Sequence, residues 1–203
     1  WPTTMAVKPT GCFSLTRAQI ERLGAARSQD IIIFANQVSD NDAYIKICAE
    51  IARHYTDRTV YLKLKYHRDY ITPRLYDRYL EVFGEQPDNV VISEILPYEL
   101  LLQAGYSFSG LSTVVAEALQ MGVTSYFIDT YEEDKDVVFR DFPDLCVSTA
   151  AQAIENIRLI ENGNSTYPRQ KFSDLIDLSE NNIFDVIRSD ASLPRWQEKL
   201  HTE

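Results

Sequence analysis

Two short polar segments of this sequence combine residue types that can bind phosphate. The first is Lys65-Tyr66-His67-Arg68, with three potential cations; His67 can donate to a phosphoryl oxygen or protonate a leaving group. The second is Ser109-Gly110-Leu111-Ser112-Thr113, which runs into an apolar stretch typical of a helix. Free N–H groups, the helix dipole and hydroxyl groups together favour an anion. The segments indicate an anionic ligand, and a simple helix cap at Ser112 is the alternative.

Two sets of carboxylates follow the second segment: Glu117, and an acidic run at residues 129–136. Glu117 lies one turn into the expected helix, where it can accept hydrogen bonds from sugar hydroxyls or simply be a solvated glutamate. The acidic run contains no histidine, and its spacing matches no calcium loop. We therefore expect a solvated loop there and no bound metal.

An alternation of apolar and helical stretches predicts the elements that position these residues. Strands are expected at residues 31–35, 59–64, 89–92, 106–109, 123–128 and 145–147. Helices are expected at 42–55, from Pro73, from Pro97, at 112–121 ending at Gly122, and at 150–161. This order predicts an α/β Rossmann-like fold, a parallel sheet of about six strands with helices on both faces. Ligands bind at the carboxyl edge of such a sheet, where both polar segments would lie.

Length and composition bound the domain organisation. The 203 residues correspond to one α/β domain with extensions: a linker or extension at 1–30, a Rossmann-like domain at 31–163 and a helical tail at 164–203. The net charge of −10 disfavours a general nucleic-acid binder. The apolar runs are far shorter than the roughly 20 residues that span a bilayer. At most, peripheral membrane association is expected.

Several familiar signatures are absent from the sequence. It contains no GxGxxG, GxxxxGK[ST], GxSxG or HExxH motif, so the dehydrogenase, P-loop, α/β-hydrolase and zincin classes lose their usual support. The cysteines, Cys12, Cys48 and Cys146, include no CxxC pair, which gives no support to a zinc or redox site. Widely spaced cysteines agree with a reducing cytoplasm as the compartment.

The polar segments, taken together with the sequence between them, resemble a known family. Lys65-x-His67 is followed by Ser93-Glu94-Ile95-Leu96-Pro97 and then by Ser109-x-x-Ser112-Thr113-x-x-x-Glu117-Ala118-Leu119-x-x-Gly122. Over residues 31–161 this series resembles the C-terminal, nucleotide-sugar-binding domain of GT-B-fold glycosyltransferases. It is most similar to bacterial sialyltransferases and capsule polysaccharide transferases, although Arg68 stands where that family usually has proline.

The resemblance implies roles for individual residues. His67, Ser112 and Thr113 would bind the donor phosphate, with His67 as the catalytic group. Ser93 and Glu94 would lie near the base, and Glu117 near the ribose or sugar hydroxyls. The remaining residues of the two polar segments would complete the phosphate site: Lys65, Arg68, Ser109 and Gly110.

The resemblance also implies a reaction: metal-independent transfer from a nucleotide sugar, with a CMP-sugar favoured, to a surface glycan or glycolipid. This chain would be the donor half of an enzyme of the cytoplasm or of the inner face of the membrane, and it would need no cofactor beyond its nucleotide-sugar substrate. An N-terminal acceptor domain, on a missing segment or a partner, would supply the general base. Two alternatives stay open: a non-catalytic Rossmann-like binding or interaction module, and a nucleotide-sugar epimerase-like domain.

Overall fold

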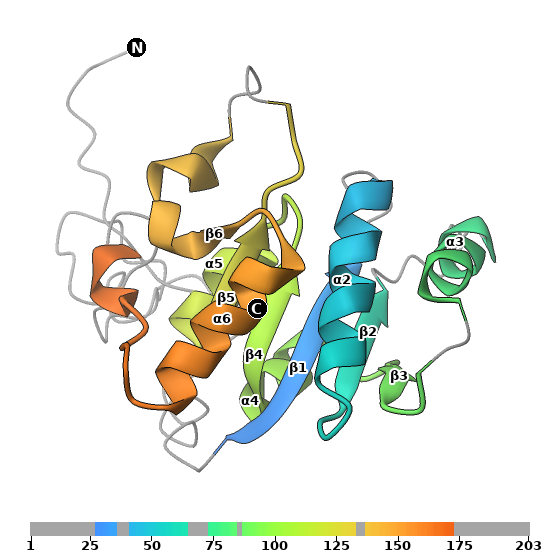
Figure 1. Ribbon diagram of the computed structural model, residues 1–203, viewed down its shortest axis with the longest axis horizontal. Coiled ribbons are helices and arrows are strands. Elements are labelled where there is room, and N and C mark those ends of the chain that lie inside the picture. Colours follow the sequence, from blue (N-terminus) through green and yellow to red (C-terminus); the bar gives the residue numbers. More distant parts are fainter. Residues whose placement is uncertain (1–26, 36–40, 65–72, 85–86, 133–136, 173–203) are drawn as a thin grey trace, which may run out of the picture.

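A single parallel sheet forms the centre of the molecule. The computed structural model describes residues 27–35, 41–64, 73–84, 87–132 and 137–172 (Figure 1). Its strands pair in the order β3-β2-β1-β4-β5-β6, and every pair is parallel. They are β1 (Ser28–Ala35), β2 (Val60–Leu64), β3 (Val90–Ile92), β4 (Ala104–Ser109), β5 (Thr124–Ile128) and β6 (Cys146–Val147). The predicted α/β fold with a parallel six-stranded sheet is confirmed, and its order is that of a doubly wound fold.

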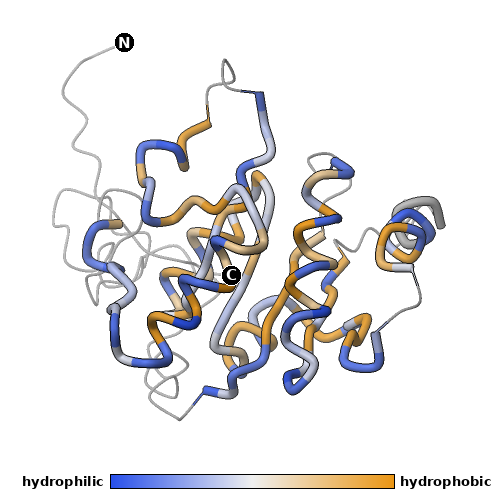
Figure 2. The backbone as a smooth tube through the Cα atoms, viewed as in Figure 1, coloured by the Kyte–Doolittle hydropathy of each residue, from blue (hydrophilic) through white to orange (hydrophobic). Residues whose placement is uncertain are grey.

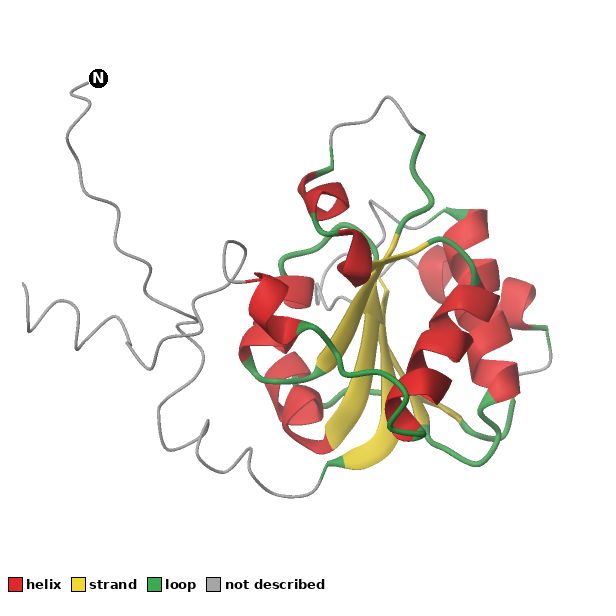
Figure 3. Cartoon of the chain, turned by 60° about the vertical axis from the view of Figure 1, so that its left-hand side comes forward, coloured by secondary structure: helices red, strands yellow, loops and turns green. Residues whose placement is uncertain are grey.

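Helices cover both faces of the sheet, as Figures 1 and 3 show. One face packs against α2 (Asp42–His54), α3 (Pro73–Phe83) and α6 (Ala150–Glu161), and the other packs against α4 (Pro97–Gln103) and α5 (Val114–Gln120). After β5, the described residues form three 3₁₀ helices, namely η2 (Val138–Asp141), η3 (Pro143–Leu145) and η4 (Arg169–Phe172). Within the described residues, no helix combines the length and apolarity needed to cross a membrane.

The apolar run of β1 is explained by its central place in the sheet. Ile31, Ile32 and Ile33 are all 0% exposed, because helices cover both sets of alternating side chains. Ile31 and Ile33 belong to the cluster under α2, whereas Ile32 and Phe34 belong to the cluster under α4 and α5. Figure 2 shows this apolar centre, with the hydrophilic segments lying mostly around it.

Local sequence signals set the ends of the helices. The Asn41 side chain caps α2 by accepting a hydrogen bond from the N–H of Tyr44 at 2.9 Å. Gly122 ends the α5 segment with a φ of 80°, and the N–H of Val123 donates to the carbonyl of Ala118 at 2.9 Å. This pattern needs a left-handed residue, which glycine supplies without strain, so the predicted glycine terminus is confirmed.

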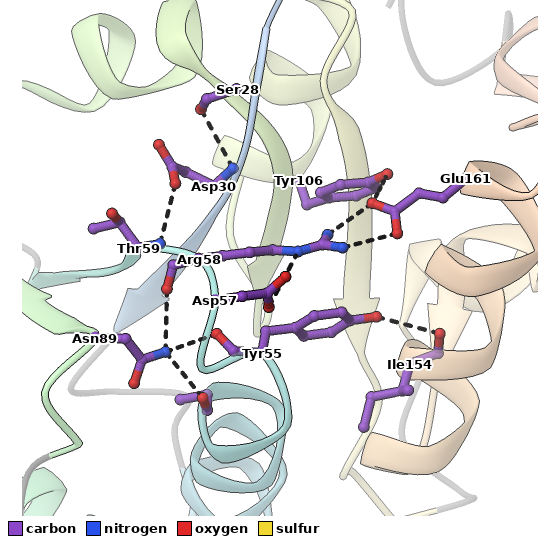
Figure 4. Close-up of polar contacts among 11 residues, drawn as sticks. Ser28, Asp30, Tyr55, Asp57, Arg58, Thr59, Asn89, Tyr106, Ile154 and Glu161 are labelled. Atoms are coloured by element: carbon purple, nitrogen blue, oxygen red, sulfur yellow. Dashed lines mark hydrogen bonds and ion pairs between the residues drawn. The ribbon is translucent and has the colours of Figure 1, made fainter.

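The amino edge of the sheet is closed by a polar cluster, shown in Figure 4. Arg58 donates two hydrogen bonds to the Glu161 carboxylate, at 2.7 and 2.8 Å, and the Tyr106 hydroxyl donates a third at 2.9 Å. The Arg58 guanidinium also lies 4.4 Å from the centre of the Tyr55 ring. Close by, the Asn89 amide donates to three backbone carbonyls. These contacts tie α6 to the starts of β2 and β4.

The segment after α6 returns to the core. Phe172 is 1% exposed and belongs to the apolar cluster with Phe139 and Leu145, while the Tyr167 hydroxyl donates to the carbonyl of Ser125. Residues on the predicted tail therefore pack against β5. Residues 173–203, where further tail helices were expected, lie outside the described residues.

The Arg58–Glu161 pair yields a prediction about stability. Replacing Glu161→Ala leaves the Arg58 guanidinium, whose side chain is 9% exposed, with only the exposed Asp57 carboxylate, 4.0 Å from its Nε. We expect the free energy of unfolding to fall by about 1.5–3 kcal/mol, the usual contribution of hydrogen bonds to a charged group. Urea denaturation at pH 7 measures this loss. The control Glu155→Ala removes an ion pair with both side chains about half exposed, at 50% and 54%, and no measurable change is expected there.

The same pair sets a pH dependence. Hydrogen bonds from Arg58 hold the pKa of Glu161 below its usual value. Its contribution to stability is therefore complete above the unfolded pKa of glutamate, about 4.3, and is lost as the pH falls through the lower folded value. The difference in stability between the wild type and Glu161→Ala should shrink across that acidic range. A difference that stays constant down to pH 3 would contradict this assignment.

Candidate functional site

The sheet order creates a switch point between β1 and β4. After β1 the chain enters α2 on one face, and after β4 it enters α5 on the opposite face. Adjacent connections that leave to opposite sides open a crevice at the carboxyl ends of the two strands, which is where ligands bind in such sheets. Ser109 is the last residue of β4 and pairs with Phe34 of β1. The predicted 109–113 segment thus begins at the carboxyl end of this strand pair.

Ser109 brings a buried hydroxyl to the switch point. Its side chain is 1% exposed, and its Oγ has no hydrogen-bond partner among the described residues. Ser107 and Ser125 have the same property, but they lie deeper in their strands. A buried hydroxyl without a partner is unfavourable by about 1–3 kcal/mol. Ser109 therefore presents an unsatisfied donor at the edge where a ligand would bind.

The rest of the loop is partly occupied by its own contacts. The Ser112 Oγ accepts a bond from the N–H of Val114 at 3.4 Å, and the Thr113 hydroxyl donates to a Glu117 carboxylate oxygen at 3.3 Å. Gly110 is buried, whereas Thr113 is exposed. The N-cap position of α5 is Thr113, without a side-chain capping bond, so Ser112 makes only a local contact just before the helix and is not its cap. The hydroxyl proton of Ser112 is left able to donate to an anion.

Ser93 and Glu94 lie at the same edge, directly after β3. Ser93 is 7% exposed, and its Oγ accepts a bond from the N–H of Ile95 at 3.2 Å, while Glu94 is exposed to solvent. Three strand spacings of about 4.8 Å separate β3 from β4 in the sheet. A ligand that touched both the 93–94 and the 109–113 segments would therefore have to be elongated.

Lys63 is a residue of this edge that sequence reasoning missed. It is 4% exposed, and its ammonium donates to the Ser93 carbonyl at 3.2 Å. Burial lowers the pKa of this ammonium, and the nearby charge of Glu94 offsets part of the lowering. A lysine alternating with apolar residues suggests a solvent-facing position. The burial of Lys63 could have been predicted from the parallel sheet, because helices cover both faces of such a sheet and a charged side chain within a strand then has to be buried.

Lys65, His67 and Arg68 lie outside the described residues, and their part in the site stays a prediction. β2 ends at Leu64, at the carboxyl edge of the sheet.

The acidic run after β5 differs from the solvated loop that was expected. Asp129 is bound by the Arg140 guanidinium, with Nε–Oδ2 at 2.6 Å and Nη2–Oδ1 at 3.0 Å, and its side chain is 13% exposed. Arg140 also donates to the carbonyls of Tyr131 and Glu132. The solvated-loop expectation is therefore wrong for Asp129, because its charge is matched by an arginine of η2. The described part of the chain contains no group of three or more His, Cys, Asp or Glu residues that could hold a metal.

The fold and the switch-point edge define a Rossmann-like α/β domain. No protein-family model and no curated protein sequence matches this chain. Among solved structures, a putative UDP-N-acetylglucosamine 2-epimerase from Listeria monocytogenes matches with a TM-score of 0.47 and 14% identity, over 78% of this chain and 43% of that one. The UDP-GlcNAc 2-epimerase from Neisseria meningitidis, bound to UDP-GlcNAc, matches with a TM-score of 0.49 and 16% identity, over 74% of this chain and 41% of that one. The chain spans about two fifths of the length of either structure, and likenesses this distant assign no activity.

The unpartnered hydroxyl of Ser109 yields a prediction. Replacing Ser109→Ala should leave the free energy of unfolding unchanged or raise it by up to about 1 kcal/mol, because the substitution removes a buried polar group that bonds to nothing. The control Ser93→Ala should lower it by about 0.5–1.5 kcal/mol, because that hydroxyl accepts a backbone hydrogen bond. Guanidinium denaturation compares the two. A clear loss of stability in Ser109→Ala would show that the hydroxyl has a partner within the protein.

Proposed function

We propose that this chain is the nucleotide-sugar-binding domain of a sugar-transferring enzyme, with the ligand phosphate at residues 109–113. The observation that supports this most directly is the Ser109 hydroxyl, buried and without a partner among the described residues, at the reversal between β1 and β4. A phosphate oxygen would give that hydroxyl the acceptor it lacks. The neighbouring Ser112 and Thr113 supply further hydroxyls on the same loop.

The arrangement of the edge favours a nucleotide sugar over a smaller phosphate. Ser93 and Glu94 follow β3, three strands away from the 109–113 loop, so that an elongated ligand would be needed to use both. Hydroxyl groups suit phosphate oxygens, and the carboxylates of Glu94 and Glu117 suit the hydroxyls of a ribose or a sugar. We therefore place the base near residues 93–94 and the sugar near Glu117.

The chemistry follows from the charge that develops when the sugar leaves. Cleavage of the bond between the sugar and the phosphate leaves negative charge on the departing nucleotide, and donors fixed around that phosphate stabilise it. Ser109 and Ser112 would do this from one loop, joined by Thr113 when its hydroxyl turns away from Glu117, and Lys65, His67 and Arg68 would do so from the other. His67 would act as the acid toward the leaving phosphate. The acceptor and its general base would come from another domain or partner.

A ligand panel tests the proposal. Thermal unfolding is measured with CMP-, UDP-, GDP- and CDP-linked sugars, and the preference for CMP is decided by the same panel. One class should raise the melting temperature by several degrees, since saturation at 100 times Kd adds about 2.7 kcal/mol of stability. Ser109→Ala combined with Ser112→Ala should abolish the rise. The matched control Ser107→Ala removes an equally buried hydroxyl two residues from the edge and should retain it. No response to any nucleotide sugar would favour the interaction-module alternative.

A second variant tests the predicted histidine. His67→Ala should weaken the binding of the stabilising nucleotide sugar by tenfold or more, because it removes a charged or polar donor to the phosphate. His54→Ala serves as the control, since His54 is exposed at the end of α2 and hence at the opposite edge of the sheet. Isothermal titration calorimetry gives both affinities. Equal affinities in the two variants would remove His67 from the site.

A further inference from the structure

A buried ammonium lies one strand from the switch point. Lys63 is the fourth residue of the five-residue strand β2 and is 4% exposed. Its single hydrogen bond within the described residues goes to a neutral group, the Ser93 carbonyl, at 3.2 Å. No described carboxylate lies within 4.0 Å of it, and Glu94 acts on it only from a greater distance. Two of its three N–H donors thus lack a partner within this part of the chain.

The register places Lys63 and Ser109 in one row. Phe34 of β1 pairs with Lys63 on one side and with Ser109 on the other. Residues in register on parallel strands point to the same face of the sheet, which here is the face covered by α4 and α5. Lys63 and Ser109 therefore flank Phe34 at the carboxyl edge, about 10 Å apart between Cα atoms at two strand spacings.

Both residues are unfavourable for the unliganded fold. A buried charge is tolerated when it is paired, and a neutral carbonyl compensates an ammonium only in part. The Ser109 hydroxyl is 1% exposed and has no partner in the described chain. Two buried groups with unused donors, in one row at the ligand edge, indicate that a ligand supplies the missing acceptors.

We propose that Lys63 binds a phosphoryl group of the ligand at this edge, with Ser109 donating to the same anion from the far side of Phe34. The flexible four-carbon stem of lysine lets the ammonium turn toward the crevice when the anion arrives. The proposal rests on the proposed function for the phosphate at Ser109, and what it adds is Lys63 as a second residue that binds this phosphate. Lys63 is thus a binding residue distinct from the cations predicted at Lys65, His67 and Arg68.

The test uses inorganic pyrophosphate as the probe and Lys63→Met as the variant. Calorimetry and thermal unfolding are carried out on the full chain at pH 7.5. The wild type should bind pyrophosphate, and Lys63→Met should bind it at least tenfold more weakly. The unliganded variant should melt at the same temperature as the wild type or higher, because an apolar side chain of similar length replaces a poorly paired charge. Lys46→Met makes the same substitution at an exposed position of α2 and should change neither quantity.

A measurement on the wild type covers the case in which Lys63→Met does not fold. The Lys63 side chain is followed by NMR with ¹³C-labelled lysine while the pH is varied, with and without pyrophosphate. A bound anion favours the ammonium, so pyrophosphate should move the Lys63 titration to higher pH. The proposal is overturned if that titration does not move, if the wild type binds no pyrophosphate, or if a folded Lys63→Met binds it with unchanged affinity.

The outcomes also separate this inference from the proposed function. Lys63-dependent binding of pyrophosphate without binding of any nucleotide sugar would uphold the inference and remove the proposed function. Nucleotide-sugar binding that survives in Lys63→Met would uphold the proposed function and remove the inference.

Discussion

The pairing of β1 with strands on both of its sides is the constraint on which the rest of the structure depends. Because crossovers between parallel strands are right-handed, extending the sheet from β1 toward β2 and then from β1 toward β4 sends the connecting helices to opposite faces. The start of the β1–β4 pair is tight: a Cβ on Gly105 would lie 2.6 Å from the carbonyl oxygen of Ser28, and the register shifts there. Only glycine permits that approach, and the pairing it allows places Ser109 beside Phe34 at the switch point.

The two edges of the sheet are built differently. At the amino edge, both terminal nitrogens of Arg58 bind the Glu161 carboxylate and the Asn89 amide donates to three backbone carbonyls, although the Arg58 Nε has no partner among the described residues. At the carboxyl edge, Lys63 has one neutral acceptor, and Ser109 has none among the described residues. Such an uneven distribution is expected when one end of a domain stabilises the fold and the other is kept for a ligand, because binding groups are often unfavourable for the unliganded state.

The apolar pattern of the sequence was enough to predict the elements but not their pairing. The strand at residues 31–35 and the end of the helix at Gly122 depend on local sequence, and both predictions were confirmed. The strand order depends on which strands meet in space, and a period along the chain does not record that. The burial of Lys63 and the pairing of Asp129 with Arg140 were missed for the same reason. Each depends on an element that comes from elsewhere in the chain, namely the helical layer over β2 and the 3₁₀ turn after β5.

The acidic character of the chain and its buried ammonium act at different ranges. A net charge of −10 repels a polyanion at the surface, where salt screens the field beyond about 10 Å. A small anion that reaches Lys63 instead meets a charge in a poorly hydrated environment, where the attraction is several-fold stronger than in water. The net negative charge repels every phosphate of a nucleic acid, whereas the attraction of Lys63 acts only on the one anion that reaches it. At the site that we propose, this combination would favour a small phosphorylated molecule over a nucleic acid.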